Sequence, residues 1–178
     1  AKMLPDYPLA EQVQFFIQNI QKMSTSTVLR AALALRTAGY IFSENDKILT
    51  RLIEDVADVQ NPLLAVNILR FLSESEAKNA MDRLLPLLMN LAYVPHLPPD
   101  SALGVLELTV KHAPQERETI EQLWVRFTTE NDMASLPFHI TLQAYFLLLG
   151  VENEEKLSHF HQLEQNVINE KVLHLLPS

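Results

Sequence analysis

The sequence predicts an all-α fold built from antiparallel helical hairpins. Short, almost wholly apolar segments alternate with longer amphipathic ones, and the pairs recur about every 34 to 40 residues. The chain has only three glycines and no Asn-Gly or Asp-Gly pair, so the tight turns that join β-strands are nearly absent. Such a hairpin cannot cover its own apolar face, so we expect neighbouring hairpins to stack around a shared core.

Four hairpins follow one another in the chain. The apolar segments cover 28–38, 63–72, 102–110 and 140–149, and their amphipathic partners cover 48–59, 77–91, 120–127 and 157–168. An amphipathic stripe over 9–23 precedes them and has the polar outer side that the end of a stack requires. We expect about nine or ten helices in a short right-handed or irregular stack. A compact orthogonal helical bundle would show the same stripes and is the alternative fold.

Several helix boundaries are predicted from residues with specific backbone preferences. The hydroxyl residues at 24–27 offer N-caps to the first apolar segment, and Gly39 is suited to end it. Ser43, followed three residues later by Asp46, resembles a capping box. Asn61 followed by Pro62 starts the second apolar helix, because Asn caps and proline suits the first helical position.

We expect a single helical-repeat domain over residues 1–178. Hydrophobic residues make up 48% of the chain and charged residues 20%, a composition typical of a folded globular protein. The proline-rich stretch 95–99 is the best candidate for a subdivision. The net charge of −8 is unevenly spread, with −1 on residues 1–89 and −7 on residues 90–178. A polyanion would therefore be repelled from the C-terminal half.

The first two apolar segments also match each other residue by residue. At an offset of 34, Ala-Ala-Leu-Ala-Leu-Arg at 31–36 stands beside Ala-Val-Asn-Ile-Leu-Arg at 65–70, which gives Arg36 and Arg70 the same repeat position. The later pairs match in apolar pattern. In this general form the chain resembles α-solenoids of the HEAT, armadillo and octotricopeptide kind over about residues 26–166. That resemblance implies stacked hairpins that bind a partner on a curved surface.

Familiar catalytic motifs are missing from the sequence. Without cysteine, and with three isolated glycines, it holds no thiolate zinc site, no cysteine nucleophile and no glycine-rich phosphate loop. No Gly-x-Ser-x-Gly motif marks a serine nucleophile. We therefore expect a protein that is not an enzyme and that uses no cofactor and no metal.

Two clusters of ionisable residues could carry chemistry but have plainer interpretations. Glu155 and His159 are one helical turn apart, but His161 points to another face, so we interpret this group as an ordinary surface helix. Glu54, Asp55 and Asp58 form the second group, in which Glu54 and Asp58, also one turn apart, would raise each other's proton affinity if buried. They alternate with apolar positions of an amphipathic helix, and we interpret them as part of a solvated outer face.

A set of cations on the N-terminal hairpins is the most suggestive functional feature, together with one aromatic residue. If stacking places Arg36 and Arg70 in one row, they could meet phosphates or an acidic partner peptide. The plainer interpretation is a solvated surface paired with nearby carboxylates. Trp124 becomes an anchor for a partner if it is exposed. The predicted partner-binding residues are Arg30, Arg36, Lys47, Arg51, Arg70 and Trp124.

The function that these observations favour is a non-catalytic protein–protein interaction domain, an adaptor, scaffold or regulatory module that binds another protein or peptide. The alternative is a helical-repeat RNA-binding domain that uses the arginines of the N-terminal half, against which the net charge of −8 counts. The lack of cysteine suits a reducing intracellular compartment, either the cytoplasm or an organelle lumen. The longest apolar runs are shorter than the roughly 20 residues that span a bilayer, so we expect no membrane insertion.

Overall fold

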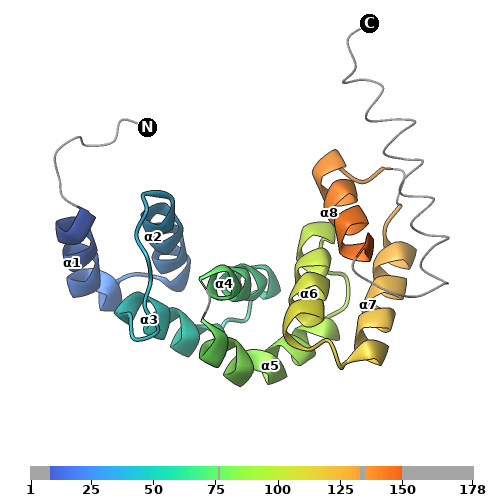
Figure 1. Cartoon of the computed structure of the whole chain (residues 1–178), viewed down its shortest axis with the longest axis horizontal. Helices are drawn as coiled ribbons and strands as arrows, with labels where there is room; N and C mark the ends of the chain where they lie inside the picture. Colours follow the sequence, from blue (N-terminus) through green and yellow to red (C-terminus); the bar gives the residue numbers. More distant parts are fainter. Residues whose placement is uncertain (1–8, 76, 133–134, 150–178) are drawn as a thin grey trace, which may run out of the picture. The chain divides into compact units, whose positions relative to one another are not determined.

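The computed structural model describes residues 9–75, 77–132 and 135–149. Within them eight α-helices and one 3-10 helix follow one another without a strand, which confirms the all-α class for this part of the chain (Figure 1). The solenoid stack and the compact bundle both stay predictions. The predicted helix at 157–168 and the group formed by Glu155, His159 and His161 lie outside the described residues.

Contacts along the chain define two compact units, Ala1–Leu87 and Leu88–Ser178, here called unit 1 and unit 2. The point of division lies inside helix α5 (Lys78–Ala92), before the proline-rich stretch 95–99. Pro86 lies inside this helix without ending it. A single domain, with its subdivision at 95–99, remains a prediction from the sequence.

Unit 1 begins with α1 (Leu9–Asn19), which continues into the short 3-10 helix η1 (Ile20–Lys22). The helices α2 (Thr25–Thr37), α3 (Lys47–Val56) and α4 (Pro62–Glu74) follow, and each of these three contacts the other two. Their apolar stripes meet in one core. Its largest completely buried side chains include Ile48, Leu49, Leu52, Ile68, Leu69, Phe71 and Leu72.

The predicted caps of α2 and α4 are confirmed. Ser24 Oγ accepts a hydrogen bond from the backbone N–H of Thr27 at 3.3 Å, and Asn61 Oδ1 accepts one from the N–H of Leu63 at 3.0 Å. Gly39 follows the end of α2 with a φ of +93°, where its lack of a Cβ avoids strain. The backbone N–H groups at 39 and 40 both return to carbonyl oxygens in the last turn of α2, at 3.0 and 2.9 Å.

The start of α3 differs from the prediction. Asp46 caps this helix, with its Oδ1 accepting from the N–H of Ile48 at 2.9 Å. The backbone N–H of Asp46 donates to the carbonyl oxygen of Ser43 at 3.0 Å, which closes a turn before the helix begins. The predicted Ser43 capping box is therefore wrong, because Ser43 lies three residues ahead of the true N-cap.

Unit 2 centres on α6 (Pro99–His112), which contacts both α7 (Arg117–Glu130) and α8 (Phe138–Leu149). Its core includes Leu103, Val105, Leu106, Leu108, Ile120, Leu123, Trp124, Phe127, Ile140 and Ala144. A side-chain hydrogen bond from Gln143 Nε2 to Glu107 Oε2, 2.9 Å long, links α8 to α6 at the surface. None of the described helices combines the length and the apolar composition that crossing a bilayer requires.

Candidate functional site

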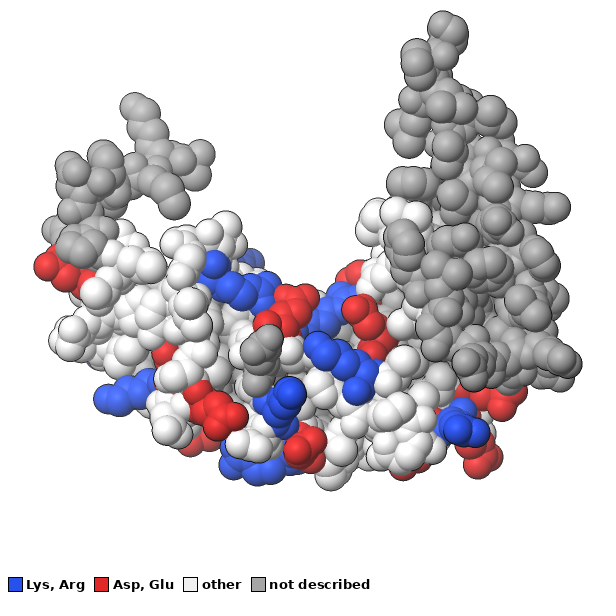
Figure 2. All heavy atoms as spheres, viewed as in Figure 1, with Lys and Arg blue, Asp and Glu red and all other residues white. Residues whose placement is uncertain are grey.

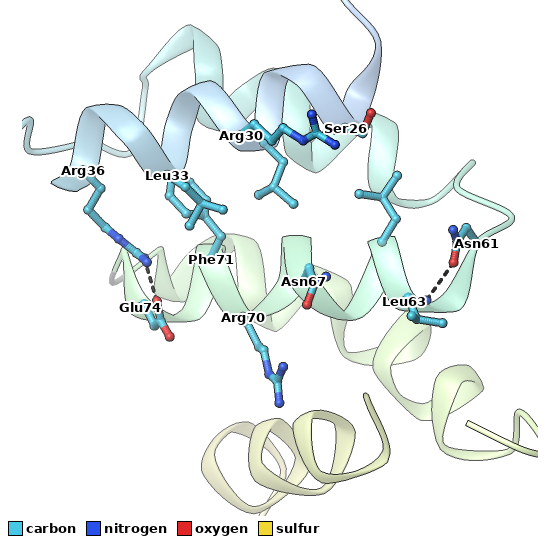
Figure 3. A pocket seen from close by; sticks show the side chains of 12 residues that line it. Ser26, Arg30, Leu33, Arg36, Asn61, Leu63, Asn67, Arg70, Phe71 and Glu74 are labelled. Carbon is cyan, nitrogen blue, oxygen red and sulfur yellow. Dashed lines mark hydrogen bonds and ion pairs between the residues drawn. The ribbon is translucent and has the colours of Figure 1, made fainter. Parts of the chain in front are cut away.

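A groove of about 600 Å³ lies between α2 and α4 of unit 1 (Figure 3). One wall of the groove is a single stripe of α4, formed by the lining residues Leu63, Asn67, Arg70 and Glu74, which are four, three and four positions apart. The lining residues are Ser26, Leu29, Arg30, Leu33 and Arg36 from α2, and Asn61, Leu63, Leu64, Asn67, Arg70, Phe71 and Glu74 from α4 and its N-cap.

Three of the six predicted site residues, Arg30, Arg36 and Arg70, line this groove. Arg36 is the best defined, because its Nη1 lies 2.7 Å from Glu74 Oε2 and its guanidinium carbon lies 5.0 Å from the centre of the Phe71 ring. A guanidinium over an aromatic face is attracted by the negative charge of that face, so the ring favours this position of Arg36. Arg70 extends from α4 and points away from α2 (Figure 3).

The apolar part of the groove was not singled out from the sequence. Leu33 and Leu63 have exposed fractions of 37% and 43%, although leucine is usually buried. Each of them shares a helix face with polar or charged lining residues, Leu33 with Arg30 and Leu63 with Asn67. A leucine inside an otherwise polar stripe is the signal that could have identified both.

The surface around the groove has mixed charge. On the face that Figure 2 shows, Lys and Arg atoms over α2 and α4 lie next to Asp and Glu atoms. The ion pair between Arg36 and Glu74 is one such neighbour pair within the groove itself. A uniformly basic surface, as expected for a nonspecific polyanion site, is therefore absent from this face of the described residues.

Arg51 lies outside the groove lining and makes structural hydrogen bonds within unit 1, and its role in partner binding stays a prediction. Its Nη1 and Nη2 donate to the carbonyl oxygens of Ile20 and Met23 at 2.7 and 3.1 Å, and its Nε donates to Asp55 Oδ2 at 2.6 Å. The same Asp55 oxygen accepts from Thr25 Oγ1 at 2.8 Å. Arg51 on α3 thus stabilises the end of η1. Asp55, which we interpreted from the sequence as part of a solvated face, accepts hydrogen bonds from Arg51 and Thr25.

Lys47 and Trp124 also lie outside the groove. Lys47 is exposed at the first position of α3. Trp124 is only 3% exposed and packs beside Phe127, with ring centres 5.8 Å apart. The exposure that an anchoring role for Trp124 requires is therefore not met, because its helix turns this side chain into the core of unit 2.

A second network supports the floor of the groove from inside unit 1. The Tyr40 ring meets the Phe42 ring edge to face at 4.8 Å, and Phe42 meets Phe71 in the same way at 5.3 Å. The Tyr40 hydroxyl donates to Asp46 Oδ2 at 2.6 Å, so the N-cap of α3 and the aromatic chain are joined. The Phe71 ring therefore packs against Phe42, and the Arg36 guanidinium lies over the same ring.

This hydrogen bond makes the stability of unit 1 depend on pH at the alkaline end. The bond to Asp46, with burial and the Asp46 charge, raises the pKa of Tyr40 from 10.0 to about 12. A raised pKa in the folded state stabilises the fold below pH 10, and this contribution is lost as the pH rises toward 12. Tyr40→Phe should lower the free energy of unfolding by about 1 kcal/mol below that range.

Urea denaturation of both proteins over a pH series measures this difference. The gap between wild type and Tyr40→Phe should shrink between the ordinary and the raised pKa of Tyr40, because only the wild type has a phenol to ionise. A gap that stays constant across this range would contradict the proposed role of the hydrogen bond.

The groove lining includes one hydroxyl side chain, Ser26, and one carboxylate, Glu74, which is paired with Arg36. The twelve lining residues include no histidine, aspartate, lysine or tyrosine that could pair with Ser26 as base or acid. Among the residues that the structure describes, no three histidine, cysteine or acidic side chains are grouped as metal ligands would be. What the groove offers is an apolar surface with guanidinium groups beside it.

A smaller hollow of about 160 Å³ lies elsewhere in unit 1 and includes Arg83 in its lining. There Asn79 Nδ2 lies 3.2 Å from both carboxylate oxygens of Glu44, so much of its polar lining is already paired. Its size is well below that of ordinary ligand sites, which are about 300 to 1,000 Å³. The groove between α2 and α4 is therefore the better candidate.

Comparison with protein-family models, with curated proteins and with solved structures found no match for this chain.

Proposed function

We propose that this chain is a non-catalytic polypeptide-binding domain, and that the groove between α2 and α4 is its binding surface. The observation that carries this proposal is the combination of two half-exposed leucines, Leu33 and Leu63, with Arg30 and Arg36 in one groove. Apolar anchors surrounded by polar and charged groups are the usual composition of a protein–protein interface. The groove lies between two adjacent helices, α2 and α4, an arrangement that suits a short peptide segment.

A stacked-hairpin architecture fits this proposal and has support in a repeated contact. In unit 1, Arg51 donates to the carbonyl oxygen of Ile20, 31 residues earlier. In unit 2, Arg126 Nη2 donates to the carbonyl oxygen of Ala92, 34 residues earlier, at 2.7 Å. In each case an arginine on one helix binds the end of a helix about one hairpin earlier, as expected for repeating units.

RNA binding by the same arginines is the competing proposal and has less support. Single-stranded RNA is usually held by aromatic side chains on which its bases stack. Phe71 is the aromatic residue among those lining the groove, and it is only 1% exposed. Its face is covered by Arg36 rather than open to a base.

Selection of displayed peptides tests the proposed function. The full chain is immobilised and exposed to a phage library of random peptides, and the same selection is run on Leu33→Glu and Ile41→Glu. Leu33→Glu places a charge in the groove and should lower the affinity of selected peptides about tenfold or more. Ile41 is 89% exposed and lies outside the groove lining, so Ile41→Glu should leave the affinity unchanged.

Two results would overturn polypeptide binding at this groove. One is that no peptide is retained above the level seen with Leu33→Glu. The other is that labelled polyuridylate binds the wild type at physiological salt and is released when Arg36 and Arg70 are both replaced by glutamine, which would favour the RNA alternative.

A further inference from the structure

We infer that the groove takes an acidic segment of its partner, and that Glu74 occupies the place of one partner carboxylate in the free protein. This inference rests on the proposed function and adds the chemistry of the partner. The two arginines that α2 contributes to the groove lining, Arg30 and Arg36, and the one glutamate, Glu74, give a formal charge of +1 on a chain whose net charge is −8. An acidic partner would gain charge-assisted hydrogen bonds there that a neutral one lacks.

Arg36 already has the form of a carboxylate-binding group. Its guanidinium carbon lies 5.0 Å from the centre of the Phe71 ring, and its Nη1 lies 2.7 Å from Glu74 Oε2 (Figure 3). A planar guanidinium matches a carboxylate better than an ammonium group does, because its N–H groups form a rigid fork. Glu74 therefore shows where an incoming carboxylate would bind.

Exchange of Glu74 for a partner carboxylate would be inexpensive. The side chains of Arg36 and Glu74 are 34% and 58% exposed, so water screens their attraction. Exposed pairs of this kind contribute about 0 to 1 kcal/mol. The Glu74 side chain can rotate toward the solvent, and a partner carboxylate can then bind Arg36. Apolar contacts between the partner and Leu33 would hold that carboxylate in place.

The spacing of the groove also constrains the partner sequence. Arg30 precedes Arg36 by six residues, which is about 9 Å along the axis of α2. Leu33 lies between these two arginines on α2. We therefore expect a partner segment with acidic residues on both sides of an aliphatic residue that contacts Leu33.

The selected peptides test the partner chemistry directly. Enrichment of aspartate and glutamate around an aliphatic residue supports the inference. Enrichment of neutral or basic peptides that still lose affinity with Leu33→Glu would overturn it and leave polypeptide binding standing. The two proposals therefore fail in different ways.

The role of Glu74 is tested by affinity measurements with the most enriched peptide, made synthetically with a fluorescent label. Glu74→Gln should bind it about two- to fivefold more tightly, because the internal competitor is lost. Arg36→Gln should bind it about tenfold more weakly. Far-UV circular dichroism checks that each variant keeps the helical content of the wild type.

Glu54→Gln is the matched control for charge, because Glu54 is an exposed carboxylate of α3 outside the groove lining. It changes the net charge by the same amount and should leave the affinity unchanged. Equal gains for Glu54→Gln and Glu74→Gln would overturn the inference, since the effect would then be one of net charge. Unchanged or weaker binding by Glu74→Gln would overturn it as well.

Discussion

Replacing Phe71 by alanine is expected to lower the free energy of unfolding by about 3 to 5 kcal/mol. Phe71 is 1% exposed, and it contacts the Phe42 ring below and the Arg36 guanidinium above. Its removal would leave a cavity in the core of unit 1 and free the guanidinium plane. Urea denaturation of the full chain, followed by far-UV circular dichroism, measures the change.

Leu33→Ala is the matched control for this prediction, because Leu33 lines the same groove and is 37% exposed. Its removal should cost about 1 kcal/mol or less, since water already covers much of the side chain. Similar losses for the two variants would contradict the assignment of Phe71 to the core and of Leu33 to the surface.

Replacing Arg51 by methionine is expected to lower the free energy of unfolding by about 3 kcal/mol. The variant keeps much of the apolar stem but loses the donors to Ile20, Met23 and Asp55. Asp55 would remain only 22% exposed without its cation, the Met23 carbonyl oxygen would lose its guanidinium donor, and the Ile20 carbonyl oxygen would keep only the Met23 N–H. The same denaturation measurement applies.

Lys47→Met provides the comparison, since Lys47 is an exposed cation one turn earlier on the same helix. It changes the net charge equally and should alter stability by less than about 0.5 kcal/mol. A loss for Arg51→Met no larger than for Lys47→Met would show that the network around Asp55 adds nothing to stability.

The helices could be predicted from the sequence because their signals are local. The apolar stripe and cap of α4 need only the residues from Asn61 onward, and Gly39 ends α2 through its own backbone preference. The error at Ser43 has the same local origin. Ser43 and Asp46 can both cap a helix and lie three positions apart. In the structure the N–H of Asp46 closes a turn onto the Ser43 carbonyl, and α3 begins after Asp46.

The functional assignments depended on contacts between distant residues, which a single sequence does not specify. Arg30 and Arg51 have the same chemistry and lie on successive helices, yet Arg30 is exposed in the groove and Arg51 binds carbonyl groups about 30 residues away. Trp124 lies on an amphipathic helix whether it is exposed or not, and in the structure it is buried in unit 2, where α7 contacts α6. Arg36 and Arg70, which the offset of 34 matched, both line the groove between α2 and α4.

The hydrogen bonds of Arg51 have a consequence for the protein while it is still being made. The carbonyl oxygens of Ile20 and Met23 receive their guanidinium partner only from a residue that the ribosome adds 31 and 28 positions later. Until Arg51 has left the exit tunnel, the Met23 carbonyl must rely on water and the Ile20 carbonyl has only the backbone N–H of Met23, so this helix end can fray. The end of η1 is therefore completed only when α3 has been translated, and in unit 2 the Ala92 carbonyl gains its Arg126 partner from a residue added 34 positions later.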